Sequence, residues 1–572
     1  MGRNRRAEPY RATSTLARSR HDRYTAGGLG YPPPDPQPRA VALIVMPPRF
    51  SVLTAVCDPP IEVLERCLAS VREQAFNDWE HIIVDDASTD PDVHLILHRA
   101  ESDARVRVRR RADRGGIVAA SNDALAAATG DIVALLDHDD ELAPHALSTM
   151  AAVYDDEECD VTYSDHDLIR PDGRRSDPFF KPDFSPERLR HQNYITHFMT
   201  ARRSIVEAVG GFRPGFDGAQ DHDLILRLTE AARQVIHVPD VLYHWRQGLG
   251  SVALDPSAKQ YAYDNGRRAV EEHCARVGIT ATVDVGDHLG TFVVRRPTSS
   301  QVTVLVAAPM ETGVVWGRKR HHLARLAASL DQFTHQMGAE LIVGVPNGAA
   351  AEALQLLDEA GCIGRVVEVG ASDSLWSAAL NEASTDIVVP VAEQMMLDHG
   401  SDIGAMAAHL AADDVSMVGC SQLNSDRTVR HGGFVTDHLG AHPILAGWAA
   451  SHPGPGRLMA ITREVGAIDV VGGALRSDRL QALLAQGDDA AITDEGVRLC
   501  AHDIAAGNRV IWTPQAVWYR FDPSHSGSPV VAMSDRYSNS KLCAGRGDWL
   551  ERPGCAGAAP YRLADNGIRV WS

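Results

Sequence analysis

The sequence has no closely spaced cysteines and no long apolar run. Its nine cysteines are scattered without any Cys-x-x-Cys spacing, which disfavours a zinc site and a disulfide framework in a chain of 572 residues. No apolar run approaches the roughly 18 residues that a membrane span needs. The stretch Val41–Met46 is too short for the core of a signal peptide. We therefore expect a cytoplasmic protein whose membrane contact is at most peripheral, at the inner face of the plasma membrane.

Basic residues are also scarce. Lys and Arg number 56 against 75 Asp and Glu, which gives a net charge of −19. A broad nucleic-acid-binding surface needs clustered basic residues, so no nucleic-acid partner is expected. The first 49 residues differ, with nine arginines against three acids and no apolar periodicity. This composition predicts a disordered basic arm over residues 1–48, which is either a solvated tail or a contact for anionic lipid headgroups.

From Phe50 onward the pattern predicts strands that alternate with helices. Strands are expected at 51–56, 81–84, 105–109 and 132–136, of which 51–56 and 132–136 are expected to be buried and 105–109 alternates in polarity. Helices are expected at 61–74 and 115–129. Such alternation predicts a mostly parallel sheet with helices on both faces. Ligands bind such sheets at the carboxyl ends of the strands. The acidic clusters Asp85-Asp86 and Asp137–Asp140 both fall at such ends.

The same order of elements begins again at Val302. Strands are expected at 302–306, 340–343, 365–369 and 386–389, after a linker near 295–300. We infer a tandem duplication with diverged sequence. The predicted fold is α/β with two tandem domains over residues 49–295 and 296–525, each a mostly parallel sheet flanked by helices. The tail, residues 526–572, has no functional interpretation.

Four sites carry side chains suited to chemistry. Asp137 and Asp139, offset by two residues, can share one Mg²⁺ or Mn²⁺ and leave room for diphosphate oxygens, although acidic turns are also common solvated features. Asp86 can accept hydrogen bonds from a nucleobase or ribose, or cap a helix. Asp221, at the start of a predicted helix, is either a cap or a general base. His244 follows a predicted strand and is either structural or a ligand.

Residues 50 to about 280 resemble an inverting glycosyltransferase of family 2 with the nucleotide-diphospho-sugar-binding GT-A fold. Many blocks match in one order, and they are most similar to bacterial polysaccharide-assembling members of the family. The matching stretches are 50–58 (FSVLTAVCD), 82–90 (IIVDDASTD), 128–140 (ATGDIVALLDHDD), 163–167 (YSDHD), 178–194 (PFFKPDFSPERLRHQNY), 210–228 (GGFRPGFDGAQDHDLILRL) and 242–246 (LYHWR).

The resemblance implies a role for each of these sites. Asp221 matches the catalytic base, and it follows Gln220 where other members carry Glu. The nucleotide-sugar-binding residues implied are Thr54, Asp86 and Asp137. The implied ligands of Mn²⁺ or Mg²⁺ are Asp139 and His244.

The activity implied is transfer of a sugar from a nucleotide-diphosphate donor to a hydroxyl of a growing cell-surface or cell-wall glycan, free or lipid-linked. The base takes the proton of the acceptor hydroxyl as it attacks the anomeric carbon from the opposite face, and the metal neutralises charge on the departing diphosphate. Two alternatives stay open. One is a non-catalytic sugar- or nucleotide-binding scaffold, and the other is a nucleotidyltransferase. Association into homo-oligomers also stays open.

The second half resembles the same family but differs at the chemical positions. We therefore expect a degenerate, inactive copy there, although Glu393 and Asp494 could restore carboxylates if the register is shifted. The aligned pairs are Asp137 with Ala392, Asp139 with Gln394, Asp221 with Ile492, and His244 with Tyr519.

Overall fold

The computed structural model describes residues 48–247, 260–297, 301–371, 373–437, 440–485 and 492–522, and two short strands at 561–563 and 569–571. The chain divides into a unit Met1–Met46 and a compact unit Pro47–Ser572. The predicted basic arm, apart from Pro48, lies outside the described residues, as does most of the predicted tail. No helix among the described residues is long and apolar enough to cross a membrane. Below, residues 49–295 are called the first half and residues 296–525 the second half.

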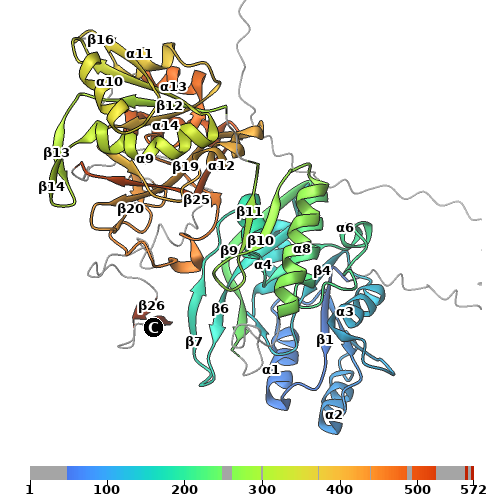
Figure 1. Cartoon of the computed structure of the whole chain (residues 1–572). Helices are drawn as coiled ribbons and strands as arrows, with labels where there is room; N and C mark the ends of the chain where they lie inside the picture. The colour runs from blue at the N-terminus through green and yellow to red at the C-terminus, as the bar shows by residue number, and fades with distance from the viewer. Residues whose placement is uncertain are drawn as a thin grey trace, which may run out of the picture. The chain divides into compact units, whose positions relative to one another are not determined.

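The first half begins with four parallel strands, in blue to cyan in Figure 1. The strands are β1 (Phe50–Val56), β2 (Trp79–Asp85), β3 (Val106–Arg110) and β4 (Ile132–Leu135), in the order β3-β2-β1-β4. Three of them, β1, β2 and β4, are mostly buried, as expected for strands that helices cover, whereas β3 at the end of the sheet is partly to fully exposed. The connecting helices are α1 (Ile61–Arg72), α2 (Pro91–Ala100) and α3 (Gly116–Ala127). The predicted strands and helices of this region are confirmed.

Beyond β4 the sheet becomes mixed. β8 pairs antiparallel with both β4 and β6, β9 runs parallel to β6, and β5 and β7 pair antiparallel with β9 and β6. These strands are β5 (Glu141–Leu142), β6 (Cys159–Ile169), β7 (Arg175–Phe179), β8 (Met199–Arg202) and β9 (Gln234–Arg246). The other elements of the first half are α4 (Ala146–Val153), α5 (Pro186–His191), α6 (Arg203–Ala208), α7 (Gln220–Ala231), α8 (Gln260–Arg276), β10 (Thr282–Val285) and β11 (Phe292–Arg295).

The second half holds a second mixed sheet, coloured yellow to orange in Figure 1. Its strands are β12 (Thr303–Ala307), β15 (Glu340–Pro346), β16 (Arg365–Val369), β17 (Ile387–Ala392), β18 (Met395–Leu397), β19 (Val415–Asn424), β20 (Val429–His431), β23 (Arg463–Glu464), β24 (Ala474–Arg476) and β25 (Arg509–Arg520). The helices are α9 (His322–Met337), α10 (Ala350–Glu359), α11 (Leu375–Asn381), α12 (Ile403–Ala407), α13 (Ser477–Leu484) and α14 (Ile492–Ala505). Small hairpins are formed by β13 (Thr312–Val315) with β14 (Arg318–His321), and by β21 (Phe434–Asp437) with β22 (Gly440–Pro443).

The two sheets share one topology. The first runs β3-β2-β1-β4-β8-β6-β9-β5 and the second runs β16-β15-β12-β17-β24-β19-β25-β18, with β7 and β20 beside β6 and β19. Two neighbouring strands that are parallel in the first order are also parallel at the same place in the second order, and the same holds for antiparallel neighbours. The first sheet also carries β26 (Tyr561–Leu563) and β27 (Arg569–Trp571) beside β7. The predicted α/β fold with mostly parallel sheets flanked by helices is thus confirmed.

A carboxylate joins the starts of the strands in the first half. Glu80 on β2 is opposite Ser51 on β1 and accepts a hydrogen bond of 2.6 Å from its hydroxyl. The same carboxylate accepts the N–H and the hydroxyl hydrogen of Thr129, at 2.6 and 2.9 Å, and pairs with Arg107 on β3. This arrangement ties three strands and the end of α3 together at the sheet edge opposite the ligand-binding edge.

The second half repeats this arrangement with the same residue types. Glu340 on β15 is opposite Thr303 on β12 and accepts its hydroxyl hydrogen at 2.6 Å. It also accepts the N–H and the hydroxyl hydrogen of Ser384, at 2.9 and 3.0 Å, and pairs with Arg365 at 3.0 Å. The two halves therefore agree in side-chain contacts as well as in topology.

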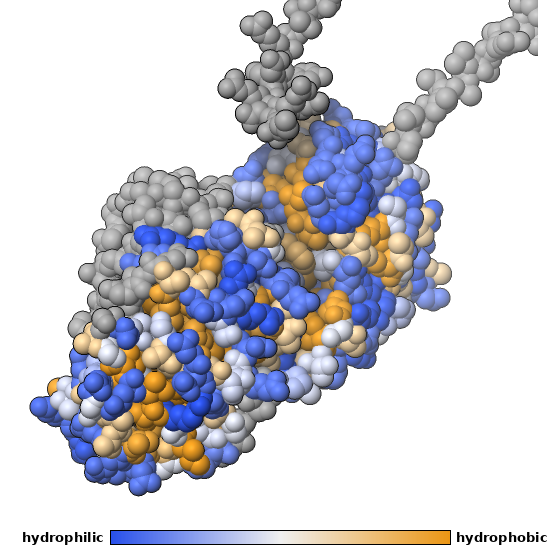
Figure 2. Space-filling model, turned by 90° about the horizontal axis from the view of Figure 1, so that it is seen from above, coloured by the Kyte–Doolittle hydropathy of each residue, from blue (hydrophilic) through white to orange (hydrophobic). Residues whose placement is uncertain are grey.

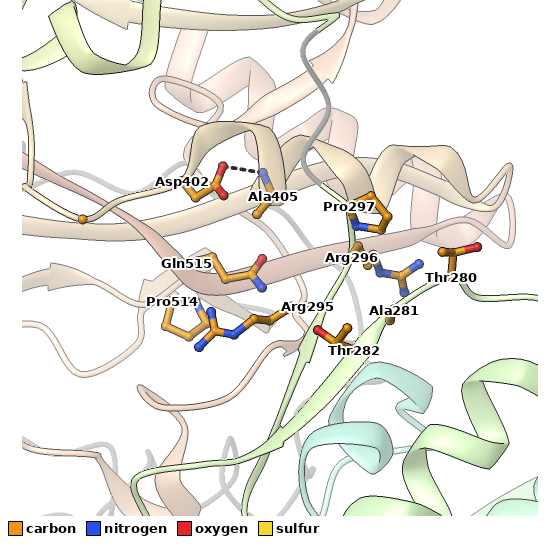
Figure 3. A pocket seen from close by; sticks show the side chains of 11 residues that line it. Thr280, Ala281, Thr282, Arg295, Arg296, Pro297, Asp402, Ala405, Pro514 and Gln515 are labelled. Atoms are coloured by element: carbon orange, nitrogen blue, oxygen red, sulfur yellow. Dashed lines mark hydrogen bonds between the residues drawn. The ribbon is translucent and has the colours of Figure 1, made fainter. Parts of the chain in front are cut away.

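Each half has its own hydrophobic core. One core cluster contains residues from 302 to 519, and three others contain residues between 50 and 294. On the face shown in Figure 2, hydrophobic residues form several separate patches among hydrophilic ones. A pocket lies between β10–β11 and the second half (Figure 3), lined by residues such as Thr282 and Arg295 on one side and Asp402 and Gln515 on the other. Gln515 donates a hydrogen bond from its amide to the carbonyl of Val294 at 3.5 Å.

Candidate functional site

A pocket lies at the carboxyl ends of β1 and β4, the sheet edge where ligands bind in folds of this kind. Its lining includes Thr54 on β1, Asp137 after β4, His197 before β8, and Asp221 and Tyr243. The sequence places Thr54, Asp137 and Asp221 far apart along the chain, and the fold brings them to one pocket.

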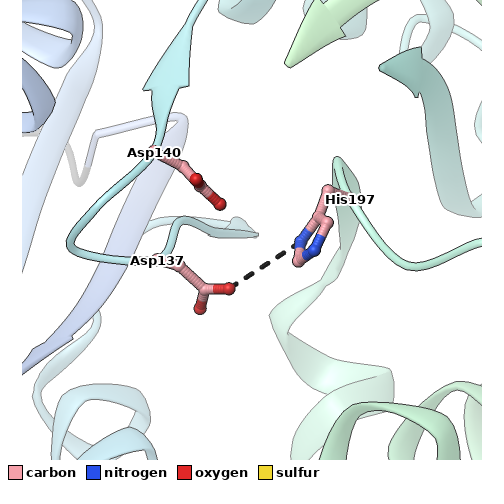
Figure 4. A group of neighbouring side chains, drawn as sticks. All are labelled: Asp137, Asp140 and His197. Atoms are coloured by element: carbon pink, nitrogen blue, oxygen red, sulfur yellow. Dashed lines mark ion pairs between the residues drawn. The ribbon is translucent and has the colours of Figure 1, made fainter. Parts of the chain in front are cut away.

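The register between β4 and β8 explains why Asp137 faces a histidine. Ala134 pairs with Thr200 in these antiparallel strands, and continuing that register sets position 137 opposite 197. The Oδ2 atom of Asp137 lies 3.8 Å from Nδ1 of His197, as Figure 4 shows. One ligand atom each from Asp137, Asp140 and His197 lie within 4.8 Å of one another. Carboxylate oxygens with an imidazole nitrogen form a donor set that suits Mn²⁺ and, through the carboxylates, Mg²⁺.

Asp140 is fixed by two hydrogen bonds from β9. Its Oδ2 accepts the hydroxyl hydrogen of Tyr243 at 2.5 Å, and its Oδ1 accepts the N–H of Arg246 at 2.7 Å. Burial raises the pKa of this carboxyl well above its ordinary value. The Tyr243 ring stacks on His197 with centroids 4.8 Å apart and an interplanar angle of 10°. Tyr243 therefore positions both Asp140 and the imidazole.

Asp139 and His244, the two predicted metal ligands, lie in different surroundings. Asp139 is partly exposed in the turn between Asp137 and Asp140. His244 is buried on β9, with Nδ1 2.6 Å from Asp167 and Nε2 2.8 Å from the Arg175 guanidinium. Both ring nitrogens of His244 are thus engaged by protein groups, and its role as a metal ligand stays a prediction.

Asp221 is the second residue of α7, where its side chain turns into the pocket. Its Oδ2 accepts a hydrogen bond of 3.0 Å from the side-chain amide of Asn193. Burial raises the pKa of Asp221 from its ordinary value, and the nearby Asp137 acts in the same direction. Burial lowers the pKa of His197 to about 4. The pocket thus holds a carboxylate of raised basicity near a neutral imidazole, an arrangement able to accept a proton.

Thr54 lines the pocket from β1, whereas Asp86 directly follows β2 and is not among the lining residues. The hydroxyl of Thr54 is 3.0 Å from Nε2 of His81, whose pKa burial lowers to about 3. Asp86 is buried, accepts the N–H groups of Gly115 and Gly116 at 2.8 Å each, and forms an ion pair of 3.0 Å with Arg111. The Asp86 carboxylate therefore shapes the turn that begins α3.

Reasoning from the sequence did not assign roles to His197, Asn193 or Tyr243. Asn193 and Tyr243 lie within stretches that match the family, so the sequence marked their positions but did not indicate what their side chains do. His197 stands three residues beyond the HQNY motif, and only the antiparallel register of β8 against β4 sets it opposite Asp137.

The equivalent edge of the second sheet lacks these groups. The register of β17 on β12 matches that of β4 on β1, which sets Ala392 and Gln394 at the positions of Asp137 and Asp139. The register of β18 on β25 likewise sets Tyr519 at the position of His244. Glu393 is buried and accepts the N–H groups of Met310 and Glu311 at 3.2 and 2.7 Å. Its carboxylate holds the loop after β12, and burial raises its pKa to about 7.

Part of the first half matches a known protein family. The model of the family described as "Glycosyl transferase family 2" matches residues 51–210. The O-antigen biosynthesis protein RfbC of Myxococcus xanthus is 35% identical over 415 residues, which are 71% of this chain and 32% of that protein. An uncharacterised Sinorhizobium fredii protein, y4gI, is 32% identical over 510 residues, 84% of this chain and 54% of that protein. The chain thus spans about a third and about half of these two relatives.

Among solved structures, Staphylococcus aureus TarS (residues 1–349) in complex with UDP-GlcNAc matches with a TM-score of 0.33 and 20% identity, over 39% of this chain and 66% of that one. The match with the family model covers β1 to α6 and so includes Thr54, Asp86, Asp137 and His197. The chain therefore contains a glycosyl transferase family 2 domain that includes residues 51–210.

Proposed function

We propose that this chain is an inverting glycosyltransferase, active through its first half, that moves a sugar from a nucleotide-diphosphate donor to a hydroxyl of a growing glycan. The observation that carries the proposal is one pocket in which Asp221 lies with the facing pair Asp137 and His197. A metal-dependent transfer of this kind uses a proton acceptor together with metal-ligating atoms, and sheets of this kind bind ligands at this edge.

We propose that the nucleotide occupies the edge formed by β1 and β2. Thr54 lines the pocket there, and Asp86 is assigned to the nucleobase or ribose. Asp86 accepts hydrogen bonds from the N–H groups of Gly115 and Gly116, and these bonds hold its carboxylate at the start of α3. Asp137 is assigned two contacts, one with the ribose and one with a divalent cation.

The donor atoms after β4 fit a divalent cation. We assign Mn²⁺ or Mg²⁺ to Asp137, Asp139 and a histidine, and we favour His197 over His244 because His197 faces Asp137. Asp140 already accepts two hydrogen bonds, so we assign it the role of holding the turn. When bound, the cation supplies charge neutralisation for the departing diphosphate.

Asp221 is assigned as the base. It accepts the proton of the acceptor hydroxyl as that oxygen attacks the anomeric carbon, and the bond to the diphosphate oxygen breaks on the opposite face, so the configuration inverts. The raised pKa of Asp221 brings its basicity closer to neutral pH, which suits general-base catalysis. Asn193 orients the carboxylate.

We propose that the second half does not transfer sugar. Ala392 and Gln394 offer no metal carboxylates, and Glu393 is occupied by two backbone N–H groups. Ile492, at the start of α14, stands where the base is expected. The alternative of a sugar- or nucleotide-binding scaffold therefore applies to this half better than to the first.

The acceptor we propose is a cell-surface or cell-wall glycan. The matched relatives include an O-antigen biosynthesis protein and, over 172 residues at 30% identity, a chondroitin synthase of Pasteurella multocida. We place the reaction in the cytoplasm, at the inner face of the plasma membrane. The cysteines among the described residues are all free thiols, as a reducing compartment permits.

The test is release of nucleoside diphosphate from a panel of sugar nucleotides, with and without Mn²⁺, in the presence of glycan acceptors. We expect diphosphate release with one or a few donors, dependent on the cation and abolished in Asp221→Asn. Binding without release supports a scaffold, and pyrophosphate formation or consumption supports a nucleotidyltransferase. Either outcome would overturn the proposal.

A further inference from the structure

The short helix α5 contacts the helix that carries Asp221 at two points. The carbonyl of Leu189 on α5 accepts a hydrogen bond of 2.9 Å from Nε2 of His222, the neighbour of Asp221 on α7. Asn193, two residues after α5, donates its amide hydrogen to Asp221 at 3.0 Å. The position and orientation of the Asp221 carboxylate therefore depend on where α5 lies.

The second half holds the start of α5 through one buried carboxylate. Glu464, on β23, accepts the N–H of Glu187 at 3.1 Å and the hydroxyl hydrogen of Ser185. Ser185 is the N-cap residue of α5, and its own side chain makes no capping hydrogen bond within the helix. The first N–H groups of a helix have no partner within the helix, and an N-cap side chain usually accepts a hydrogen bond from one of them. In α5 this acceptor is Glu464, which belongs to the second half.

Arginine side chains add to this contact between the start of α5 and Glu464, which is called the joint below. Arg509 on β25 has Nη1 3.1 Å from Glu464 and 3.6 Å from Glu187, and its Nε lies 2.7 Å from Asp414. Arg296, at the junction of the halves, pairs with Glu187 at 2.6 Å. Because Glu187 and Glu464 are buried, each depends on these cations and hydrogen bonds for its solvation. The contact is therefore costly to break, since removing one partner leaves a buried charge unpaired.

We propose that the second half serves catalysis as a positioning element: Glu464 and Arg509 hold α5, and α5 holds the Asp221 carboxylate toward the acceptor hydroxyl. This inference rests on the proposed function, in which Asp221 is the base. It gives the second half a role that needs none of the carboxylates it lacks. A displacement of the base by about 1 Å is enough to cost a large factor in rate, so the joint need not approach the substrate to control turnover.

The test compares Glu464→Gln with Glu340→Gln in the full chain. Glu340→Gln is the control, because it also removes the charge of a carboxylate in the second half. Glu340 accepts hydrogen bonds from Thr303 and Ser384, which both lie in the second half. We expect Glu464→Gln to lower kcat about ten- to a hundredfold with the KM for the donor within twofold of wild type, and Glu340→Gln to leave kcat within twofold. The acid limb of the kcat–pH profile should shift only in Glu464→Gln, because only there does the environment of Asp221 change.

Hydrogen–deuterium exchange separates this proposal from the proposed function. In Glu464→Gln, exchange should rise in peptides that cover 185–197 and 218–224, whether or not the chain transfers sugar, and should stay unchanged there in Glu340→Gln. If wild type releases no nucleoside diphosphate, the proposed function fails while the exchange result still reports on the joint. A folded Glu464→Gln chain with unchanged exchange at 218–224 and unchanged kcat overturns the positioning role.

If Glu464→Gln does not fold, Ser185→Ala replaces it, because it deletes a single hydroxyl that contacts Glu464. It should lower kcat two- to fivefold with the same exchange pattern, in line with the modest net value of one buried hydrogen bond. An unchanged kcat and unchanged exchange in folded Ser185→Ala also overturn the proposal.

Discussion

Asn193 donates a hydrogen bond of 3.0 Å from its side-chain amide to the Asp221 carboxylate. The amide favours the ionised carboxylate, whereas burial favours the protonated form and raises the pKa of Asp221. The two effects oppose each other, and the backbone N–H of His222 and the nearby His197 also lower this pKa.

Removal of the amide should therefore move the pH dependence of turnover. In Asn193→Ala the ionised form loses its donor, the pKa of Asp221 rises further, and the acid limb of the kcat–pH profile moves to higher pH. We expect a shift of the limb by about one unit, from the typical value of a hydrogen bond to a charged group. The measurement is kcat against pH for wild type and variant, and a limb that stays in place or moves to lower pH contradicts the assignment.

Asp221→Asn should abolish turnover without weakening the donor complex. The amide occupies the same volume but accepts no proton, so kcat should fall by about 10²- to 10⁴-fold. Nucleotide affinity, measured by calorimetry in the presence of Mn²⁺, should stay within twofold. A variant that keeps near-wild-type transfer would show that another group is the base.

His197→Ala and His244→Ala should separate the two candidate imidazole ligands. His197 faces Asp137 at 3.8 Å, whereas His244 is held by Asp167 and Arg175. We expect His197→Ala to weaken Mn²⁺ binding at least tenfold, as the loss of one of a few ligands does. His244→Ala should instead lower the melting temperature, with Mn²⁺ affinity close to wild type. The reverse pattern, read by Mn²⁺ titration and thermal unfolding, would assign the cation to His244.

Tyr243→Phe should act on the cation site through Asp140. The variant removes the hydroxyl that donates to Asp140 at 2.5 Å while the ring stays able to stack on His197. We expect about tenfold weaker Mn²⁺ binding, because groups that orient the ligands of a metal contribute about 10- to 100-fold to affinity. Mn²⁺ titration followed by electron paramagnetic resonance measures the effect. Unchanged affinity would mean that the turn keeps its shape without this hydroxyl.

Glu80→Gln should destabilise the first half in a pH-dependent manner. Burial by itself raises the pKa of Glu80, but hydrogen bonds from Ser51 and Thr129 and the charge of Arg107 outweigh it, so the pKa is lowered. A carboxyl with a lowered pKa in the folded state stabilises the fold above its unfolded pKa, and this contribution is lost as pH falls through the folded pKa. We expect a loss of about 1–3 kcal/mol at pH 7 that shrinks below about pH 4. Urea unfolding at both pH values measures it, and a loss that is equal at the two pH values contradicts the linkage.

Much of the fold could be predicted from the chain alone. Apolar runs such as 51–56 and 132–136 have a length and composition that suit buried parallel strands, and acidic residues follow those strands, so the ligand-binding edge was fixed by local pattern. The repeat of the same pattern from Val302 predicted the second sheet. Asp137 and Asp221 were also singled out from the sequence, and the fold brings both to one pocket, while their roles stay predictions.

The tertiary structure decided which side chains meet. His197 carries no local signal, and it faces Asp137 only because β8 pairs antiparallel with β4 in a particular register. Glu464 lies 277 residues from Glu187, and no periodicity links a two-residue strand in one half to the start of a helix in the other. Hydrophobic periodicity reports which face of an element is buried, whereas contacts between distant polar groups depend on how whole elements are placed. The sequence by itself determined the two sheets and the edge where chemistry is expected. Only the tertiary structure decided that His244 is bound by Asp167 and Arg175, and that Asp221 is connected through α5 to the second half.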